Sequence, residues 1–315
     1  MSYLCDSYGK TTVSGQYCEE GLYGHEMACI WKATGKFPGM LGLDMSSYSP
    51  TSVANGAVGK SVEYAEEAWD AGAIVTMCWH WTAPQKYVTG NWFSTFYTDS
   101  CNLNLDKIMD GTDTEGYDLL VRDMDAIAKE LQRLQEKDIP VLWRPLHEAS
   151  GGWFWWGNCK AESYIELYRL MYDKFTNEYG LNNLIWVWNG QGNDWYPGDD
   201  VVDIIGQDLY PGYHVYTSQY SSYMAAFEST EAKKMVVLSE NGCLMDPDLM
   251  KRDGAMWGYF GTWSGEFVTD NNAFNTYAET YTELDMAIKV YNHENVITLD
   301  EMPDLKTYPI RKDAE

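Results

Sequence analysis

The sequence predicts an α/β protein, a (β/α)8 TIM barrel that forms a single domain over residues 1–315. Eight short apolar runs alternate with longer segments of helical period. Most runs are continuously apolar, as expected for parallel strands that are covered on both faces. A doubly wound sheet is the structural alternative, but its phosphate-binding turn is absent. Residues 190–195 (GQGNDW) begin like GxGxxG and then lack the last glycine.

The predicted strands follow from these apolar runs, which are, in chain order, residues 12–16, 40–44, 74–80, 140–148, 184–189, 202–210, 235–240 and 255–263. Helical period is clearest in residues 117–136 and 272–290, where apolar side chains recur at steps of three and four. Residues 61–71 and 162–179 are weaker examples. We expect all four apolar stripes to face the core.

Composition narrows the classes of function. Acidic residues (47) outnumber basic residues (22), which gives a formal net charge of −25 and argues against binding to nucleic acid or to an anionic membrane. The sequence contains no run of 18 apolar residues and therefore predicts no transmembrane helix. The 14 tryptophans and 24 tyrosines suit a neutral ring-shaped ligand such as a sugar, although aromatic residues also fill cores.

The seven cysteines are odd in number and show no CxxC spacing, so a zinc ribbon or redox motif is not expected. Two alternatives remain for Cys5, Cys18 and Cys29: one disulfide among them, or buried free thiols. The first residues lack a charged segment followed by an apolar one, so we expect no signal peptide in this sequence.

Polar and aromatic side chains gather where five of the predicted strands end. They are His80 and Trp81, His147 and Glu148, Asp208 and Tyr210, Glu240 and Asn241, and Trp263 and Glu266. In a barrel of this type the carboxyl ends of the strands converge on one face, where active sites form. We therefore expect these residues to share one site.

Two glutamates in this set have the chemistry that cleaves a glycosidic bond. One carboxyl group protonates the leaving oxygen, and the other attacks the anomeric carbon or activates water. Glu148 and Glu240 end the fourth and seventh predicted strands and form the best pair. Asp44 and Asp208 also end strands. We expect them to hold Arg144 or ligand hydroxyls.

Other chemistries lack their motifs. The five histidines show no HExxH or HxH spacing, and neither a GxSxG elbow nor a P-loop is present, so we expect no metal site. Residues 151–157 (GGWFWWG) are too aromatic for an ordinary solvent loop. They form either a buried plug or a wall for sugar stacking directly after Glu148.

Residues 143–157 (WRPLHEASGGWFWWG) resemble the acid/base signature of glycoside hydrolase family 26. Four further stretches agree with that family: residues 38–44 (PGMLGLD), 74–84 (IVTMCWHWTAP), 196–210 (YPGDDVVDIIGQDLY) and 238–242 (LSENG). The similarity runs from about residue 14 to residue 267. The first signature is long and specific, whereas LSENG alone would be weak.

The resemblance implies a retaining enzyme with Glu148 as acid/base and Glu240 as nucleophile, whose carboxyl groups would lie ~5–5.5 Å apart. It implies that His147 contacts the sugar at the bond-cleaving subsite, that Arg144 orients carboxylates, and that Tyr210 donates a hydrogen bond to Glu240. The side chains it places along the substrate cleft are His80, Trp81, Trp153, Trp156, Tyr210 and Trp263. No metal or organic cofactor is needed.

Most members of this family are endo-β-1,4-mannanases, so we expect that activity on mannan, glucomannan or galactomannan. The partner would be a β-mannan polysaccharide or manno-oligosaccharide, and we expect a secreted monomer that binds neither nucleic acid nor membrane. The alternatives are a mixed-linkage β-glucanase or a β-1,3-xylanase on the same scaffold, or a non-catalytic carbohydrate-binding protein. Endo or exo action depends on whether loops block the cleft.

Overall fold

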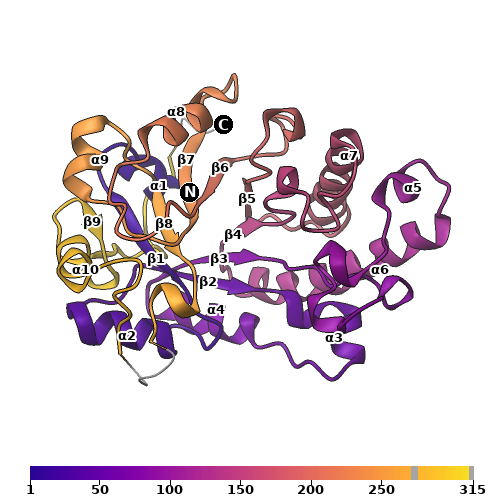
Figure 1. Ribbon diagram of the computed structural model, residues 1–315, viewed down its shortest axis with the longest axis horizontal. Helices are drawn as coiled ribbons and strands as arrows, with labels where there is room; N and C mark the ends of the chain where they lie inside the picture. The colour runs from indigo at the N-terminus through magenta and orange to yellow at the C-terminus, as the bar shows by residue number, and fades with distance from the viewer. Residues whose placement is uncertain (271–275, 312–315) are drawn as a thin grey trace. The chain divides into compact units, whose positions relative to one another are not determined.

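The computed structural model describes residues 1–270 and 276–311 and confirms the predicted (β/α)8 barrel (Figure 1). Its eight strands are β1 (Thr12–Tyr17), β2 (Met40–Asp44), β3 (Ile74–Cys78), β4 (Val141–Arg144), β5 (Leu184–Trp188), β6 (Ile204–Leu209), β7 (Met235–Asn241) and β8 (Tyr259–Thr262). They follow one another in order around the sheet, and β1 pairs with both β8 and β2. A two-residue strand, β9 (Val296–Ile297), adds to β1.

The helices are α1 (Ser2–Ser7), α2 (His25–Thr34), α3 (Pro50–Ala54), α4 (Ser61–Asp70), α5 (Leu105–Met109), α6 (Thr114–Gln135), α7 (Ala161–Tyr172), α8 (Tyr220–Glu228), α9 (Pro247–Asp253) and α10 (Leu284–Tyr291). Three of the four predicted helices are confirmed as α4, α6 and α7, the last continuing as a π-helical turn over Asp173–Glu178. The apolar stripe of α6 is buried as expected.

The fourth predicted helix, over residues 272–290, is wrong in its first half. Residues 271–275 lie outside the described part of the chain, and α10 begins only at Leu284. The backbone before α10 pairs with other segments instead: Tyr277 forms an antiparallel bridge with Thr269, and the Ala278 N–H donates to Val268. These tertiary contacts override the helical period.

The structure divides into two compact units. The first unit comprises Met1–Leu43, Glu67–Thr76 and Ile204–Glu315. Within it, Gly15 of β1 lies in register with Met40 and Gly261, and a Cβ on Gly15 would come within 2.5 Å of the Phe260 carbonyl oxygen. Only glycine allows so close an approach of neighbouring strands. Helices α2 and α10 lie side by side (Figure 1).

The second unit comprises Asp44–Glu66 and Met77–Asp203. Its core contains a cluster of tryptophans in which Trp79 and Trp81 stack at 4.0 Å and Trp155 meets Trp81 edge-on at 5.0 Å. The indole N–H of Trp81 donates to the buried carboxylate of Asp123 on α6 at 2.9 Å. This bond ties the segment after β3 to the long helix.

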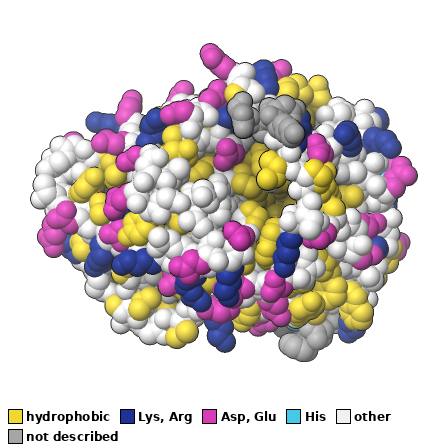
Figure 2. Space-filling model, turned by 180° about the vertical axis from the view of Figure 1, so that it is seen from behind, with side chains coloured by type: hydrophobic (Ala, Val, Ile, Leu, Met, Phe, Trp, Pro, Cys, Tyr) yellow, Lys and Arg dark blue, Asp and Glu magenta, His cyan; other side chains and the backbone are white. Residues whose placement is uncertain are grey.

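All seven cysteines are free thiols, so the alternative of a disulfide among Cys5, Cys18 and Cys29 is wrong. Acidic side chains are scattered over the face in Figure 2 and are interspersed with lysine and arginine. Among residues 1–270 and 276–311, no helix is both long and apolar enough to cross a membrane.

Candidate active site

The segment that carries Glu148 leaves the strand geometry earlier than expected. β4 ends at Arg144, and the residues on either side of His147, Leu146 and Glu148, have φ angles of 51° and 54°. Non-glycine residues in this left-handed region cost about 1–3 kcal/mol each and are concentrated at functional sites. The Glu148 N–H donates to the Asn189 carbonyl oxygen at 2.8 Å, which holds the segment in place.

The carboxylate of Glu148 is half-buried and has an aromatic donor. The indole N–H of Trp153 donates to Glu148 Oε2 at 3.0 Å, and the Trp153 side chain is 45% exposed. The ring can therefore stack on a ligand while its N–H orients the carboxylate. No motif in the sequence indicates this bond.

Asp44 and His80 form a close pair next to His147. His80 Nδ1 lies 2.5 Å from Asp44 Oδ2, and His80 Nε2 lies 3.2 Å from His147 Nε2. The other carboxylate oxygen, Asp44 Oδ1, accepts the N–H groups of Ser46 and His80. Burial raises the pKa of Asp44, but the charge of His80 and these hydrogen bonds outweigh it, so the pKa is lowered. Asp44 thus holds His80 and not Arg144, which corrects one alternative from the sequence.

His147 is kept neutral. Burial, the charge of Arg144 and the charge of His80 all lower the pKa of His147 well below 6.5. Its ring is 1% exposed and packs against Phe154 and Trp156. The expected contact of His147 with a sugar therefore stays a prediction.

Three residues predicted to bind substrate are fully buried in the structure, and their contact with substrate stays a prediction. Trp81, Arg144 and Trp156 have no exposed surface. Their polar atoms bond within the second unit: Trp81 with Asp123, Arg144 with Asn189 at 3.0 Å, and Trp156 with the His147 carbonyl oxygen at 2.8 Å. Through these bonds, the three buried side chains help to hold the segment that carries Glu148.

The first unit places Asp208, Tyr210 and Glu240 together. The parallel pairing of β6 and β7 shifts register after Gln207, so that Asp208 lies opposite Glu240. Register shifts of this kind are common next to active sites, because they redirect a side chain. Asp208 is buried and accepts the Ser239 hydroxyl at 2.7 Å.

Glu240 is a buried carboxylate with a phenol donor. Its side chain is only 4% exposed, and the Tyr210 hydroxyl donates to Glu240 Oε2 at 2.6 Å. The hydrogen bond that the sequence predicted between these two residues is present. This hydrogen bond holds the Glu240 side chain in one orientation.

Trp263 follows β8 and is fixed by β1. The ring of Trp263 contacts Tyr17 at 4.7 Å, and the side-chain amide of Gln16 donates to the Trp263 carbonyl oxygen at 3.2 Å. Neither partner was predicted from the sequence. A polar Gln16 inside an apolar strand was the available signal, since it marks a side chain with a specific buried partner.

Asp44, Cys78 and His80 are a group of potential metal ligands, because their ligand atoms lie within 4.8 Å of one another. The 2.5 Å separation of Asp44 Oδ2 and His80 Nδ1 is a hydrogen-bond distance. Two ligands of one zinc ion, each bound at about 2.0–2.1 Å in a tetrahedron, would lie roughly 3.3 Å apart. This cluster therefore fits a shared proton better than a metal ion.

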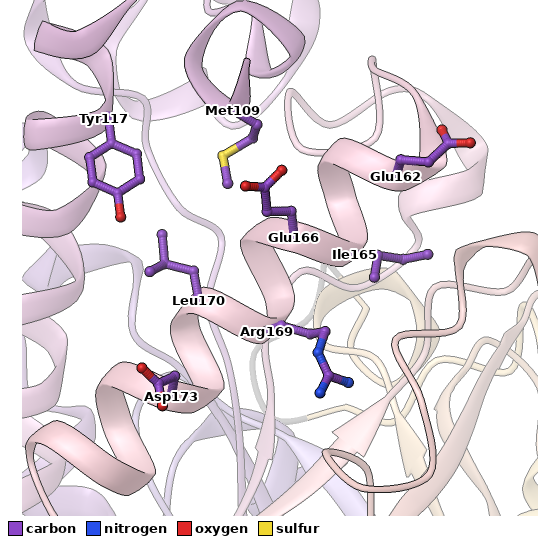
Figure 3. Close-up of a pocket in the computed structure, with 8 residues that line it drawn as sticks. All are labelled: Met109, Tyr117, Glu162, Ile165, Glu166, Arg169, Leu170 and Asp173. Atoms are coloured by element: carbon purple, nitrogen blue, oxygen red, sulfur yellow. The ribbon is translucent and has the colours of Figure 1, made fainter. Parts of the chain in front are cut away.

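A groove of about 580 Å³ lies elsewhere in the second unit, among α5, α6 and α7. Figure 3 shows Tyr117 of α6 with its hydroxyl directed toward Leu170. None of the predicted site residues lines it, and Arg169 at its edge is paired with Asp200 at 2.6 Å. The groove is thus separate in sequence and in lining residues from the predicted site.

Comparison with known proteins gives a consistent picture. The model of glycosyl hydrolase family 26 matches residues 1–301. A mannan endo-1,4-beta-mannosidase of Thermothelomyces thermophilus is 40% identical over 304 residues, which cover 95% of this chain and 60% of the relative. Mannan endo-1,4-beta-mannosidase B of a Piromyces species is 36% identical over 311 residues, covering 96% of this chain and 51% of the relative. The chain thus spans only about half to three fifths of the length of these curated relatives.

Solved structures agree with the fold. The GH26-CBM35 beta-(1,4)-mannanase of Podospora anserina superposes with a TM-score of 0.87 at 37% identity, covering 95% of this chain and 65% of that one. A beta-mannanase from a symbiotic protist of the termite Reticulitermes speratus, complexed with gluco-manno-oligosaccharide, gives a TM-score of 0.85 at 31% identity. That match covers 96% of this chain and 93% of the other.

Proposed function

Because this chain belongs to glycosyl hydrolase family 26, we propose that it is an endo-β-1,4-mannanase that hydrolyses internal bonds of mannan, glucomannan or galactomannan. The observation that carries the proposal is a pair of glutamates, Glu148 just beyond β4 and Glu240 in β7, each bound by an aromatic donor. The names of the two curated relatives and the oligosaccharide bound by the termite-symbiont protein support the choice of substrate.

The mechanism is a double displacement. Glu240, ionised and oriented by Tyr210, attacks the anomeric carbon while Glu148 protonates the leaving oxygen. Water then enters, Glu148 takes its proton, and the hydroxyl cleaves the bond between the sugar and Glu240. Both carboxylates return to their starting state, and no cofactor takes part.

Trp153 and Trp263 are the rings proposed to stack on sugar faces, because neither is fully buried. His80 is 12% exposed, and its pairing with Asp44 fixes the ring for a hydrogen bond to a sugar hydroxyl. His147 contributes by supporting His80. Mannose and glucose differ only in the orientation of one hydroxyl, so side chains of this kind decide the specificity.

Residues 1–315 act as one catalytic domain in this proposal, because Glu148 and Glu240 belong to different compact units and the reaction needs both. The retaining separation of ~5–5.5 Å between their carboxyl groups stays a prediction. We also infer a secreted monomer, since an insoluble plant polysaccharide is met outside the cell and the chain's charge of −25 suits a neutral polymer.

The test is release of reducing sugar from glucomannan, galactomannan, barley β-glucan and β-1,3-xylan, with product sizes followed over time. We expect mixed oligosaccharides from the mannans early in the reaction. A Glu240→Gln sample prepared in the same way controls for contaminating hydrolases.

Other outcomes would each overturn a stated part of the proposal. Mannobiose as the sole early product would replace endo action by exo action. Release from β-glucan or xylan alone would keep the mechanism and replace the substrate. A folded sample that is inactive on all four polymers would be a carbohydrate-binding protein.

A further inference from the structure

Three aromatic side chains form a row on the outer side of α2 in the first unit. The ring of Phe37 lies 5.8 Å from that of Tyr23 and 6.0 Å from that of Trp31. Tyr23 precedes α2 and Trp31 lies on it, and Phe37 contacts both of these rings. We call these three residues the α2 strip.

The exposure of the strip is unusual for this protein. All 14 tryptophans lie in the described part of the chain, and only Trp31 (52%) and Trp153 (45%) are exposed. Trp153 donates to Glu148 in the proposed cleft. Tyr23 is even more exposed, at 59%. Tyr23 and Trp31 thus expose aromatic surface next to the less exposed Phe37.

We propose that the α2 strip is a second carbohydrate-binding site, which holds a β-linked glycan chain outside the site of hydrolysis. This inference rests on the proposed function for its class of ligand. The planes of Phe37 and Trp31 lie within 20° of each other, while Tyr23 is turned by 84° to Phe37. Two rings offer apolar surface to pyranose C–H groups, and the third presents its hydroxyl edge.

Polar groups at the strip suit sugar hydroxyls. In the described residues, neither the Tyr23 hydroxyl nor the Trp31 indole N–H has a hydrogen-bond partner, and both side chains are exposed. Next to Phe37, Lys36 pairs with Asp300 at 2.6 Å. The neighbouring charges thus compensate each other, which fits a neutral ligand better than an ionic one.

The strip is rigid before any ligand arrives. The Phe37 carbonyl oxygen accepts the Leu299 N–H at 2.9 Å, and Pro38 forms a bridge with Thr298. Helix α2 is capped by Gly35, which has a left-handed backbone conformation. The Gly35 N–H donates to the Trp31 carbonyl oxygen at 2.7 Å. A platform that is already ordered loses little entropy when a ligand binds.

A glycan fits the strip better than a protein partner. Two rings about half exposed and the less exposed Phe37 offer on the order of 250 Å² of surface, whereas a stable protein interface takes about 800 Å² from each partner. The strip also begins near the loop of Trp263, because Glu26 of α2 accepts the Gly265 N–H at 3.1 Å. A polymer that passes Trp263 would find further aromatic surface along α2.

The test compares polymer and short substrates for the double variant Tyr23→Ala/Trp31→Ala. Binding is measured in the Glu240→Gln background by affinity electrophoresis in glucomannan gels and by co-sedimentation with insoluble mannan. Loss of two ring contacts should weaken retention about five- to tenfold. In the active enzyme, hydrolysis of insoluble mannan should fall while kcat/KM on mannopentaose stays unchanged.

Two further variants serve as controls. Tyr220→Ala removes an equally exposed tyrosine from α8, where no aromatic ring contacts it among the described residues, and should change nothing. Trp31→Phe keeps a ring and should recover part of the binding. Thermal melting confirms that each variant is folded.

The outcomes separate this inference from the proposed function. If the wild-type enzyme hydrolyses mannan and the double variant binds it as tightly, the inference is wrong and the function stands. If no polymer is hydrolysed but binding depends on the strip, the function is wrong and the strip stands. An equal loss on mannopentaose would make the strip part of the cleft. A change in sedimentation coefficient between wild type and variant would assign the strip to self-association. Each of these last two outcomes would overturn the inference.

Discussion

The segment around Glu148 and the end of β7 around Glu240 each position a carboxylate, but they do so with different backbone and different exposure. Glu148 lies on irregular backbone, between left-handed turns, half-buried and bonded to an exposed indole. Glu240 lies in strand β7, where the register with β6 shifts, and is 4% exposed and bonded to a phenol. Both are carboxylates with an aromatic donor, yet their backbone conformation and contact with solvent differ.

The difference matches what the two proposed roles require. An acid/base group changes protonation twice in each cycle and must meet both the leaving group and water, so partial exposure suits it. A nucleophile must stay ionised and aimed at one carbon atom, and a strand holds its position better than a loop. Two environments thus assign two roles to chemically equal side chains.

The largest expected loss of activity follows from replacing Glu240, the carboxylate in the strand. Glu240→Ala should reduce hydrolysis of mannan by roughly 10⁴-fold or more, because no other group forms the bond to the sugar. Reducing-sugar assays measure the loss, and circular dichroism checks that the fold is intact. An active Glu240→Ala enzyme would remove this residue from the mechanism.

Replacing Glu148, the carboxylate on irregular backbone, should give a loss of activity that depends on the substrate. Glu148→Ala should lower kcat on mannan by about 10²–10⁴-fold. Aryl mannosides with good leaving groups need little protonation, so formation of the glycosyl-enzyme from them should be much less affected. Stopped-flow release of the aryl group compares the two classes, and equal losses would argue against an acid role.

Removal of each aromatic donor is a matched comparison of the two sides. Tyr210→Phe deletes a hydrogen bond to a buried charge and should lower kcat roughly 10- to 100-fold. Trp153→Phe keeps a ring and loses only the N–H at an exposed site, so the decrease should be less than about tenfold. Without that N–H the acid form of Glu148 persists to higher pH, and the alkaline limb of the kcat/KM profile should move upward. A reversed order of the two losses would contradict the assigned roles.

The smallest effect concerns stability and the histidine beside Glu148. The pKa of His147 is lowered in the fold, so below about pH 6.5 the unfolded chain binds a proton that the folded chain refuses. This residue therefore costs stability as pH falls, by at most about 1.4 kcal/mol per pH unit. In His147→Gln the free energy of unfolding, measured in urea, should fall less steeply between pH 6.5 and 5 than in the wild type. Parallel slopes would show that His147 is not kept neutral.

Apolar runs located every strand of the barrel, but not where each strand stops. Residues 140–148 were predicted as one strand, whereas β4 ends at Arg144. Pro145 has no N–H for a ladder, and the left-handed residues after it turn the chain away. The apolar pattern continues through this turn because its side chains are buried there too, so the pattern alone could not mark the end.

Residues of the candidate site could be predicted where a motif indicates their chemistry, but the sequence does not show which aromatic side chains are exposed. Glu148, Glu240 and the bond from Tyr210 came from the sequence. Trp153 and Trp156 stand three residues apart in one aromatic stretch, yet one is 45% exposed and the other fully buried. That difference arises from how the segment packs on the tryptophans after β3, contacts that lie far apart in the sequence.

The free thiols have a practical consequence for labelling. Burial raises the pKa of Cys18 and of Cys159 to about 12 and also raises the pKa of Cys29, Cys101 and Cys243, so these thiols stay protonated near neutral pH. A thiol must ionise before it reacts with a maleimide. Cys5 and Cys159 are partly exposed and the other five cysteines, Cys78 included, are buried. With Cys5 and Cys159 replaced by serine, a single cysteine engineered on the surface should accept a fluorescent dye selectively. The motion of one enzyme molecule along a polysaccharide fibre could then be followed under a microscope.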